Sequence, residues 1–196
     1  MLTFKQVGKT NTDVTLKLAI QTALEREMDL VVATTKGDTA LRAAELAREM
    51  GFSGKDSSRR IVPSSGVGFL YPLLYFKQAS TPRYAIGFEG RCNRKALSGA
   101  ERGISKAFGG VYPVEIMAAT LRMFGQGVKV CVEIALMAAD CGAIRAKQPV
   151  MVVGGTGGGA DSACVITPSY TASLLETKVN EILCKPALLP QEETAE

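Results

Sequence analysis

The chain has 196 residues, of which 46% are hydrophobic and 21% charged, and its formal net charge is +4. This composition is typical of one globular domain, and the mild, scattered positive charge predicts neither a nucleic-acid-binding nor a membrane-binding surface. The chain contains no histidine, which excludes Ser-His and Cys-His catalysis and histidine-ligated metals. Because residues 1–11 do not resemble a secretory signal and no apolar run is long enough to cross a membrane, we expect a cytoplasmic protein.

Two strand–helix units are predicted in the first 50 residues. The elements are a weak strand at 1–7, a helix at 12–28, a strand at 30–33 and a helix that ends at Met50. Asn11 or Thr12 is the expected N-cap of the first helix, and Gly51 is expected to end the second. A strand, a turn and a helix in this order predict a parallel neighbouring strand.

Regular patterns return after residue 96, beyond a stretch (52–95) in which no element is placed. A capping box at Ser98 and Glu101 begins one helix, and Pro113 suits the first turn of the next. The further elements are a buried helix at 127–141, strands at 150–153, 163–166 and 179–184, and a short helix near Ser173. The order of elements predicts an α/β sandwich, with a single domain at 1–186 and a tail at 187–196.

The first candidate site is Thr34–Thr39, which we name the threonine turn, between the strand at 30–33 and a helix N-terminus. Its free backbone N–H groups, its hydroxyls and the positive end of a helix dipole suit a phosphate, and Gly37 permits close approach. The alternative is a plain turn in which Asp38 or Thr39 caps the helix. The turn does not have the Walker pattern.

The second candidate is Gly154–Asp161, which we name the glycine loop, between two predicted strands. Glycines accept positive φ and let a flat ligand or a phosphate touch the backbone; the alternative is a flexible connector. Asp161 either binds a ligand hydroxyl or fixes the turn. The spacing of Gly155, Gly157 and Ala160 resembles a dinucleotide-binding fingerprint, but that motif requires a helix next, so we reject it.

Lys129, Glu133 and Asp140 lie on one face of the predicted helix at 127–141. Buried carboxylates need partners, so a Lys129–Glu133 pair is the first interpretation, and a catalytic carboxylate is the second. For Glu101 the capping box is likewise the first interpretation and a ligand contact the second.

The five cysteines form no C-x-x-C pair, so we expect buried thiols in a reducing compartment rather than a zinc site. Cys131 and Cys141 are the nearest candidates for a nucleophile, although buried packing is the expected role of both.

Several ordered segments resemble a family of uncharacterised archaeal and bacterial proteins that is similar to the C-terminal α/β domain of pyruvate kinase. The matching segments, about three quarters of the chain, are 11–15, 32–40, 97–103, 127–133, 137–140, 153–161 and 181–186. The resemblance implies a three-layer α/β/α sandwich with a mostly parallel sheet. It also implies a site for flavin mononucleotide (FMN), and the corresponding threonine-rich turn of pyruvate kinase holds a regulatory sugar phosphate.

By this resemblance, the FMN phosphate binds at the threonine turn, and its ring or ribityl chain lies near Ser98, Gly99 and the glycine loop. The implied cofactor-binding residues are Asn11, Thr12, Thr34, Thr35, Lys36, Gly37, Asp38, Thr39, Ser98, Gly99, Glu101, Gly154, Gly155, Thr156, Gly157 and Asp161. Lys36, Glu101, Glu133 and Asp140 are the groups to test for proton transfer.

One departure from the family concerns 56–94, where its members have a strand and a polar loop and no strand is visible here. Disorder of 52–95 is one explanation. A reading-frame slip is another, because the codons of residues 56–60, read one base later, can spell isoleucine or threonine followed by valine or alanine, and a second slip near Lys95 would restore the frame.

Three functions remain open. The first is a cytoplasmic FMN-binding protein, with flavin-dependent oxidoreductase activity as an extension. The second is a non-catalytic module that senses a phosphorylated metabolite through the threonine turn, and the third is a non-redox enzyme acting on a phosphorylated substrate. We expect a small phosphorylated ligand and no nucleic-acid or membrane partner, and homo-oligomerisation is left open.

Overall fold

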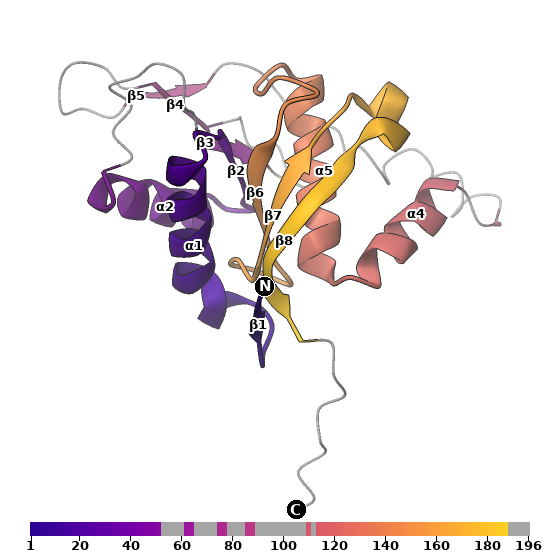
Figure 1. Cartoon of the computed structure of the whole chain (residues 1–196), viewed down its shortest axis with the longest axis horizontal. Helices are drawn as coiled ribbons and strands as arrows, with labels where there is room; N and C mark the ends of the chain where they lie inside the picture. Colours follow the sequence, from indigo (N-terminus) through magenta and orange to yellow (C-terminus); the bar gives the residue numbers. More distant parts are fainter. Residues whose placement is uncertain (52–60, 65–73, 78–84, 89–108, 111–112, 188–196) are drawn as a thin grey trace, which may run out of the picture.

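A computed structural model describes residues 1–51, 61–64, 74–77, 85–88, 109–110 and 113–187 of the chain (Figure 1). The described residues form an α/β structure with a mixed six-stranded sheet in the order β1-β8-β7-β6-β2-β3. These strands are β1 (Leu2–Phe4), β2 (Leu30–Ala33), β3 (Ile61–Ser64), β6 (Val150–Gly154), β7 (Ser162–Thr167) and β8 (Lys178–Pro186). A separate antiparallel pair consists of β4 (Leu74–Lys77) and β5 (Ala85–Phe88).

Five of the six strands in the main sheet run in the same direction. The pairs β1–β8, β2–β3 and β2–β6 are parallel, whereas β7 is antiparallel to both of its neighbours, β6 and β8. The carboxyl ends of these five parallel strands therefore lie at one edge of the sheet, which we name the carboxyl edge. The five strands are β1, β2, β3, β6 and β8.

Helices pack against both faces of the sheet. Helices α1 (Thr12–Glu25) and α2 (Asp38–Glu49) cover one face, where Leu16 and Leu46 pack against Val32. Helix α5 (Gln126–Asp140) covers the other face, and α4 (Pro113–Arg122) lies beside α5 (Figure 1). Successive side chains of β2 point to opposite faces of the sheet, so Val31 packs on the α5 side and Val32 on the α1 side.

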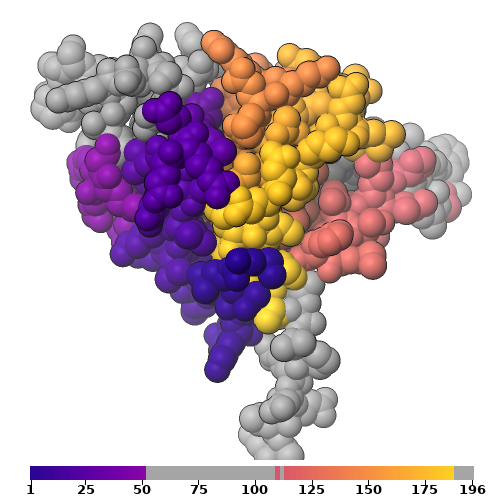
Figure 2. Space-filling model, viewed as in Figure 1, coloured from indigo at the N-terminus to yellow at the C-terminus, as the bar shows by residue number. Residues whose placement is uncertain are grey.

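The first and last strands of the described sheet lie side by side. Leu2 of β1 is in register with Cys184 of β8, and Figure 2 shows the indigo N-terminal residues against the yellow C-terminal strand. The ion pair between Arg26 and Glu181, 2.6 Å long, joins the end of α1 to the same strand.

Helix α1 ends three residues earlier than the sequence predicts. Glu27 adopts a left-handed conformation (φ 55°), and the Met28 N–H donates to Ala23 O at 2.9 Å, which closes the helix in a Schellman motif. The prediction was wrong because glycine, the usual signal for this motif, is absent from the position. At α2 the signal is present, and Gly51 follows the C-cap with φ 75°, as predicted.

Asn11 is the N-cap residue of α1, as one of the two alternatives predicts, but its side chain does not cap the helix. Its amide nitrogen donates instead to Gln6 O at 2.7 Å. The Thr12 hydroxyl accepts a hydrogen bond from Ala160 N–H at 3.1 Å, so it joins α1 to the glycine loop.

Strands β3, β4 and β5 lie within 52–95, where the sequence shows no clear element. β3 pairs in parallel with β2, from Leu30 with Ile61 to Ala33 with Ser64. A strand therefore exists in 56–94, although none is visible in the sequence. Pro63 obscures the strand in the sequence, and β3 tolerates it because the strand lies at the edge of the described sheet. The reading-frame slip stays a prediction.

Candidate functional site

Three chain segments meet at the carboxyl edge of the sheet. Residues 5–11 follow β1, the threonine turn follows β2, and the glycine loop follows β6. β2 and β6 are adjacent parallel strands, with Val32 in register with Val153, so the last two segments leave neighbouring strands. Ligands of open α/β sheets bind at this kind of edge.

The threonine turn leads into α2 through a left-handed glycine. Gly37 is the N-cap with φ 99°, and its N–H donates to Thr34 Oγ1 at 3.0 Å. The Leu41 N–H then donates to Gly37 O at 2.9 Å, which closes the first helical turn. The alternative in which Asp38 or Thr39 caps the helix was wrong, because Asp38 is the first residue of α2.

At the N-terminus of α2, the backbone N–H groups suit an anion, whereas only some of the side chains do. Gly37 has no side chain with which to cap the N–H groups of the first turn, so these groups point outwards with the positive end of the helix dipole. Thr35 and Lys36 are exposed, whereas the Thr39 side chain is buried. The exposed Asp38 carboxylate stabilises the helix dipole but repels an anion, so only its N–H suits a phosphate.

In the glycine loop the Asp161 side chain is fully buried and bonded on both oxygens. Oδ2 accepts hydrogen bonds from Gly8 N–H at 2.9 Å and Thr156 N–H at 3.1 Å, and Oδ1 accepts one from the Ser162 hydroxyl at 2.9 Å. Of its two alternative roles, Asp161 therefore has the one that fixes the turn, and it does not face a ligand.

Several glycines of this region allow close approach of backbones. A Cβ on Gly154 would lie 2.5 Å from Gly127 O, and one on Gly155 would overlap Gly159 O. A Cβ on Gly127, at the start of α5, would lie 2.6 Å from Asp161 Oδ1. By contrast, the exposed Gly157 (φ 72°) has no atom within 4 Å of its ideal Cβ, so ligand access to the backbone is open there.

The first turn of α1 is also joined to α2. The Arg42 guanidinium of α2 forms two hydrogen bonds with the Asp13 carboxylate in the first turn of α1, at 2.9 and 2.6 Å. These bonds hold the pKa of Asp13 below its usual value. The beginning of α1 is therefore joined to α2, the helix that follows the threonine turn, and to the glycine loop.

The three polar residues of α5 do not form one group. Lys129 and Glu133 are buried and form an ion pair, as expected. Asp140 is exposed and accepts hydrogen bonds from the Thr171 N–H and hydroxyl, at 3.0 and 2.7 Å, at the other end of the helix. Among the described buried side chains, Glu133 Oε1 is the oxygen without a hydrogen-bond partner.

The cysteines differ in exposure. Cys131, Cys164 and Cys184 are buried free thiols, whereas Cys141 is exposed, so the expected burial of Cys141 was wrong. Cys141 is the C-cap residue of α5. Burial raises the pKa of the Cys131 thiol well above its usual value, which makes that thiol a poor nucleophile.

Among the implied site residues, those that meet at the carboxyl edge are Asn11, Thr12, Thr34, Thr35, Lys36, Gly37, Asp38, Thr39, Gly154, Gly155, Thr156, Gly157 and Asp161. Ser98, Gly99 and Glu101 lie outside the described residues, as do the capping box and Cys92. The sequence reasoning missed Gly8, Lys9 and Ser162, which touch the glycine loop. Local sequence patterns contain no signal for them, because Gly8 and Asp161 are 153 residues apart.

A scan against models of known protein families finds none that matches the chain. In the part of the chain that the structure describes, no three histidine, cysteine or acidic side chains gather as metal ligands. None of the helices described there has the length and apolarity needed to span a membrane.

Proposed function

We propose that this chain binds FMN, with the phosphate at the threonine turn. The observation that carries the proposal is the start of α2: a left-handed glycine caps the helix without covering its first N–H groups, at the carboxyl edge beside β6. We further propose that the fold is a three-layer sandwich of the pyruvate kinase C-terminal type, in which the helices on both faces form the outer layers.

The residues present fit the phosphate end of FMN. The Thr35 hydroxyl and the first N–H groups of α2 can donate hydrogen bonds to it, and Lys36 supplies an exposed positive charge. Near Gly157 a flat ring can approach the backbone because no side chain covers it. Bound FMN supplies redox chemistry, while the protein binds and orients it.

A phosphorylated-metabolite sensor is the second candidate, and the dispersal of the proposed proton-transfer groups favours it. Glu133 forms an ion pair with Lys129. Asp140 accepts a hydrogen bond from Thr171 at the C-terminal end of α5, seven residues further along the helix. A sensor needs only the threonine turn. An enzyme that acts on a phosphorylated substrate without redox chemistry stays a prediction, as do the oxidoreductase activity and the cytoplasmic location.

The ultraviolet-visible spectrum of the purified protein, before and after loading with FMN and removal of the excess, tests the first candidate. Retained flavin bands in a one-to-one ratio support an FMN protein, and turnover of a reductant extends it to an oxidoreductase. A colourless protein that inorganic phosphate or a sugar phosphate stabilises against heat supports the sensor. A protein that neither ligand affects contradicts both.

A substitution in the threonine turn locates the phosphate. Thr35→Val is expected to weaken FMN binding by about 1–3 kcal/mol, because the exposed hydroxyl donor is lost while the side-chain volume is kept. Thr120→Val on α4 is the matched control, since that hydroxyl only donates to Ile116 O. Calorimetry that gives equal affinities for both variants would show that the threonine turn is only structural.

A further inference from the structure

The side chain of Lys9 lies along the glycine loop. An ideal Cβ on Gly158 would lie 3.4 Å from Lys9 Cε, and one on Gly159 would lie 2.8 Å from Lys9 Cα and 3.1 Å from its Cγ. Any side chain at residue 159 would also overlap the Thr12 hydroxyl. The absence of side chains at residues 158 and 159 therefore leaves the space in which the Lys9 stem runs.

The backbone on both sides of Lys9 is fixed to the same loop. Gly8 N–H donates to the buried Asp161 carboxylate, and Ala160 N–H donates to the Thr12 hydroxyl. Residues 9–11 form a single 3-10 turn between these two attachments, and the Asn11 N–H donates to Gly8 O at 3.2 Å. The start of the Lys9 side chain is thus held in place before any ligand binds.

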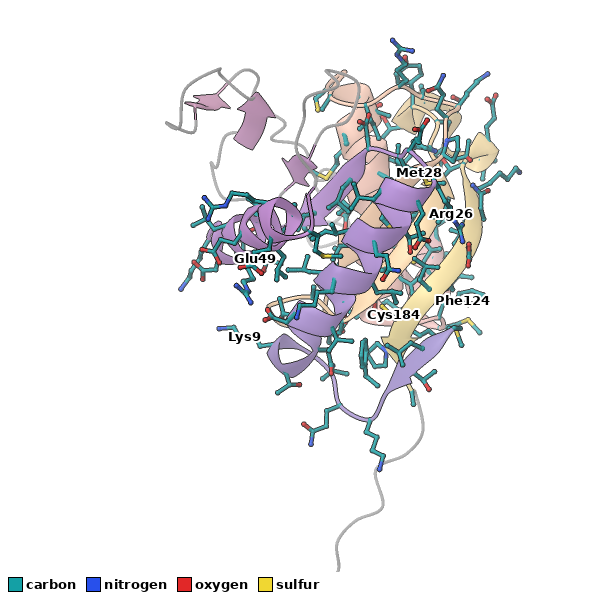
Figure 3. The ribbon with its side chains drawn as sticks, turned by 60° about the vertical axis from the view of Figure 1, so that its left-hand side comes forward. Lys9, Arg26, Met28, Glu49, Phe124 and Cys184 are labelled. Carbon is teal, nitrogen blue, oxygen red and sulfur yellow. The ribbon has the colours of Figure 1, made fainter. Side chains whose placement is uncertain are left out.

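The charge of Lys9 is available to a ligand. Lys9 is exposed, and none of the ion pairs among the described residues involves it, whereas Arg42 nearby is occupied by Asp13 and Glu45. Figure 3 shows Lys9 at the beginning of α1, the end opposite to Arg26 and Met28. The Lys9 stem lies against the glycine loop, which follows β6, and the threonine turn follows the adjacent parallel strand β2, so both belong to the carboxyl edge.

We propose that Lys9 binds the anionic group of a phosphate monoester at this edge, and that Asp161 positions Lys9 by fixing Gly8 to the glycine loop. A lysine whose stem is already packed loses less conformational freedom on binding than a free surface lysine. The inference rests on the proposed function and deepens it, because it adds a cation from another chain segment to the backbone donors of α2.

Lys9→Met tests the charge, since methionine keeps much of the stem and removes the ammonium group. We expect FMN affinity to fall about tenfold, affinity for riboflavin, which lacks the phosphate, to stay unchanged, and Lys9→Arg to restore FMN binding. Lys17→Met is the matched control, because it removes an exposed lysine of α1 from beyond the first helical turn. Equal FMN affinities of Lys9→Met and Lys17→Met would overturn the proposal.

The positioning role of Asp161 is tested in a double-mutant cycle. In an Asp161→Ala background Lys9→Met should have little further effect on FMN affinity, because Lys9 is already displaced. If Asp161→Ala does not fold, Thr12→Val loosens the other attachment of the same segment and replaces it in the cycle. Additive losses would show that Asp161 does not act through Lys9.

Inorganic phosphate separates this inference from the proposed function. If the wild-type protein takes up no FMN but phosphate raises its melting temperature and Lys9→Met abolishes that rise, the FMN proposal fails and the inference stands. If FMN binding depends on Thr35 but not on Lys9, the proposed function stands and the inference fails. A wild-type protein that responds to neither ligand refutes both.

Discussion

The glycine loop and the threonine turn end neighbouring parallel strands, but they use their polar groups in opposite ways. In the glycine loop, the N–H groups of Thr156 and Ala160 bind the Asp161 and Thr12 side chains. In the threonine turn, Gly37 caps α2 without a side chain, and the first N–H groups of the helix point away from it. The glycines of the glycine loop mainly allow backbones to pack closely. The single glycine of the threonine turn instead leaves backbone N–H donors of α2 available to a ligand.

Of the variants that test this comparison, Gly155→Ala is expected to lower the free energy of unfolding the most. Its Cβ would overlap Gly159 O and lie 3.1 Å from Ala160 Cα, so the free energy of unfolding should fall by at least about 3 kcal/mol. Gly157→Ala, the matched control in the same loop, should cost only about 1–2 kcal/mol, from its positive φ. Urea unfolding of the two variants measures the difference, and equal losses would contradict the packing role.

Asp161→Ala is expected to have the next largest effect, about 2–3 kcal/mol. Two N–H groups, of Gly8 and Thr156, lose their acceptor. Asp161→Asn should cost less, because its one oxygen can still accept both bonds. Thermal unfolding followed by circular dichroism compares them, and a loss as large for asparagine as for alanine would point to the charge rather than to the hydrogen bonds.

The buried side of the sheet can also be probed through pH. Burial raises the pKa of Cys184 from its usual 9.0 to about 11, so the folded state holds this proton more tightly than the unfolded state does. Its contribution to stability is complete below pH 9.0 and is lost as the pH rises towards about 11, with a slope of at most about 1.4 kcal/mol per pH unit. Cys184→Ala should flatten the decline in urea-unfolding free energy between pH 9 and 11, and an unchanged slope would contradict this.

The smallest effect is expected in the threonine turn. Thr34→Val removes the acceptor of the Gly37 N–H and should lower the free energy of unfolding by only about 0.5–1 kcal/mol, since both groups are partly solvated. Thr22→Val on α1 is a control that also removes one side-chain hydrogen bond, to Leu18 O. A loss above about 2 kcal/mol at Thr34 would show that the turn is as important for packing as the glycine loop.

The sequence predicts elements well where local chemistry decides them. The strand at Leu30–Ala33, the helix start at Pro113 and the buried helix at Gln126–Asp140 follow from apolar patterns and a proline in the first turn. β3 could not be predicted, because Pro63 breaks the pattern and pairing with β2 decides the strand.

The candidate site could be predicted only in part. Gly37 and the threonines give a local signal, since strand, polar turn and helix follow one another. The place of Lys9 depends on the contact of Gly8 with Asp161, which no local pattern encodes. Asp140 shares the spacing of Lys129 and Glu133 but lies at the exposed end of α5, where Thr171 binds it.

The pairing of β1 with β8 has a consequence for how the chain folds during synthesis. β1 can pair with β8 only after Lys178–Pro186 has been synthesised. The hydrogen bond from Gly8 N–H to Asp161 likewise forms only after residue 161 has been synthesised. Contacts between such distant residues close large loops and slow folding. On the ribosome, the edge at which we place the ligand would be the last part of the molecule to assemble, so phosphate binding by a nascent chain would report completion of the fold.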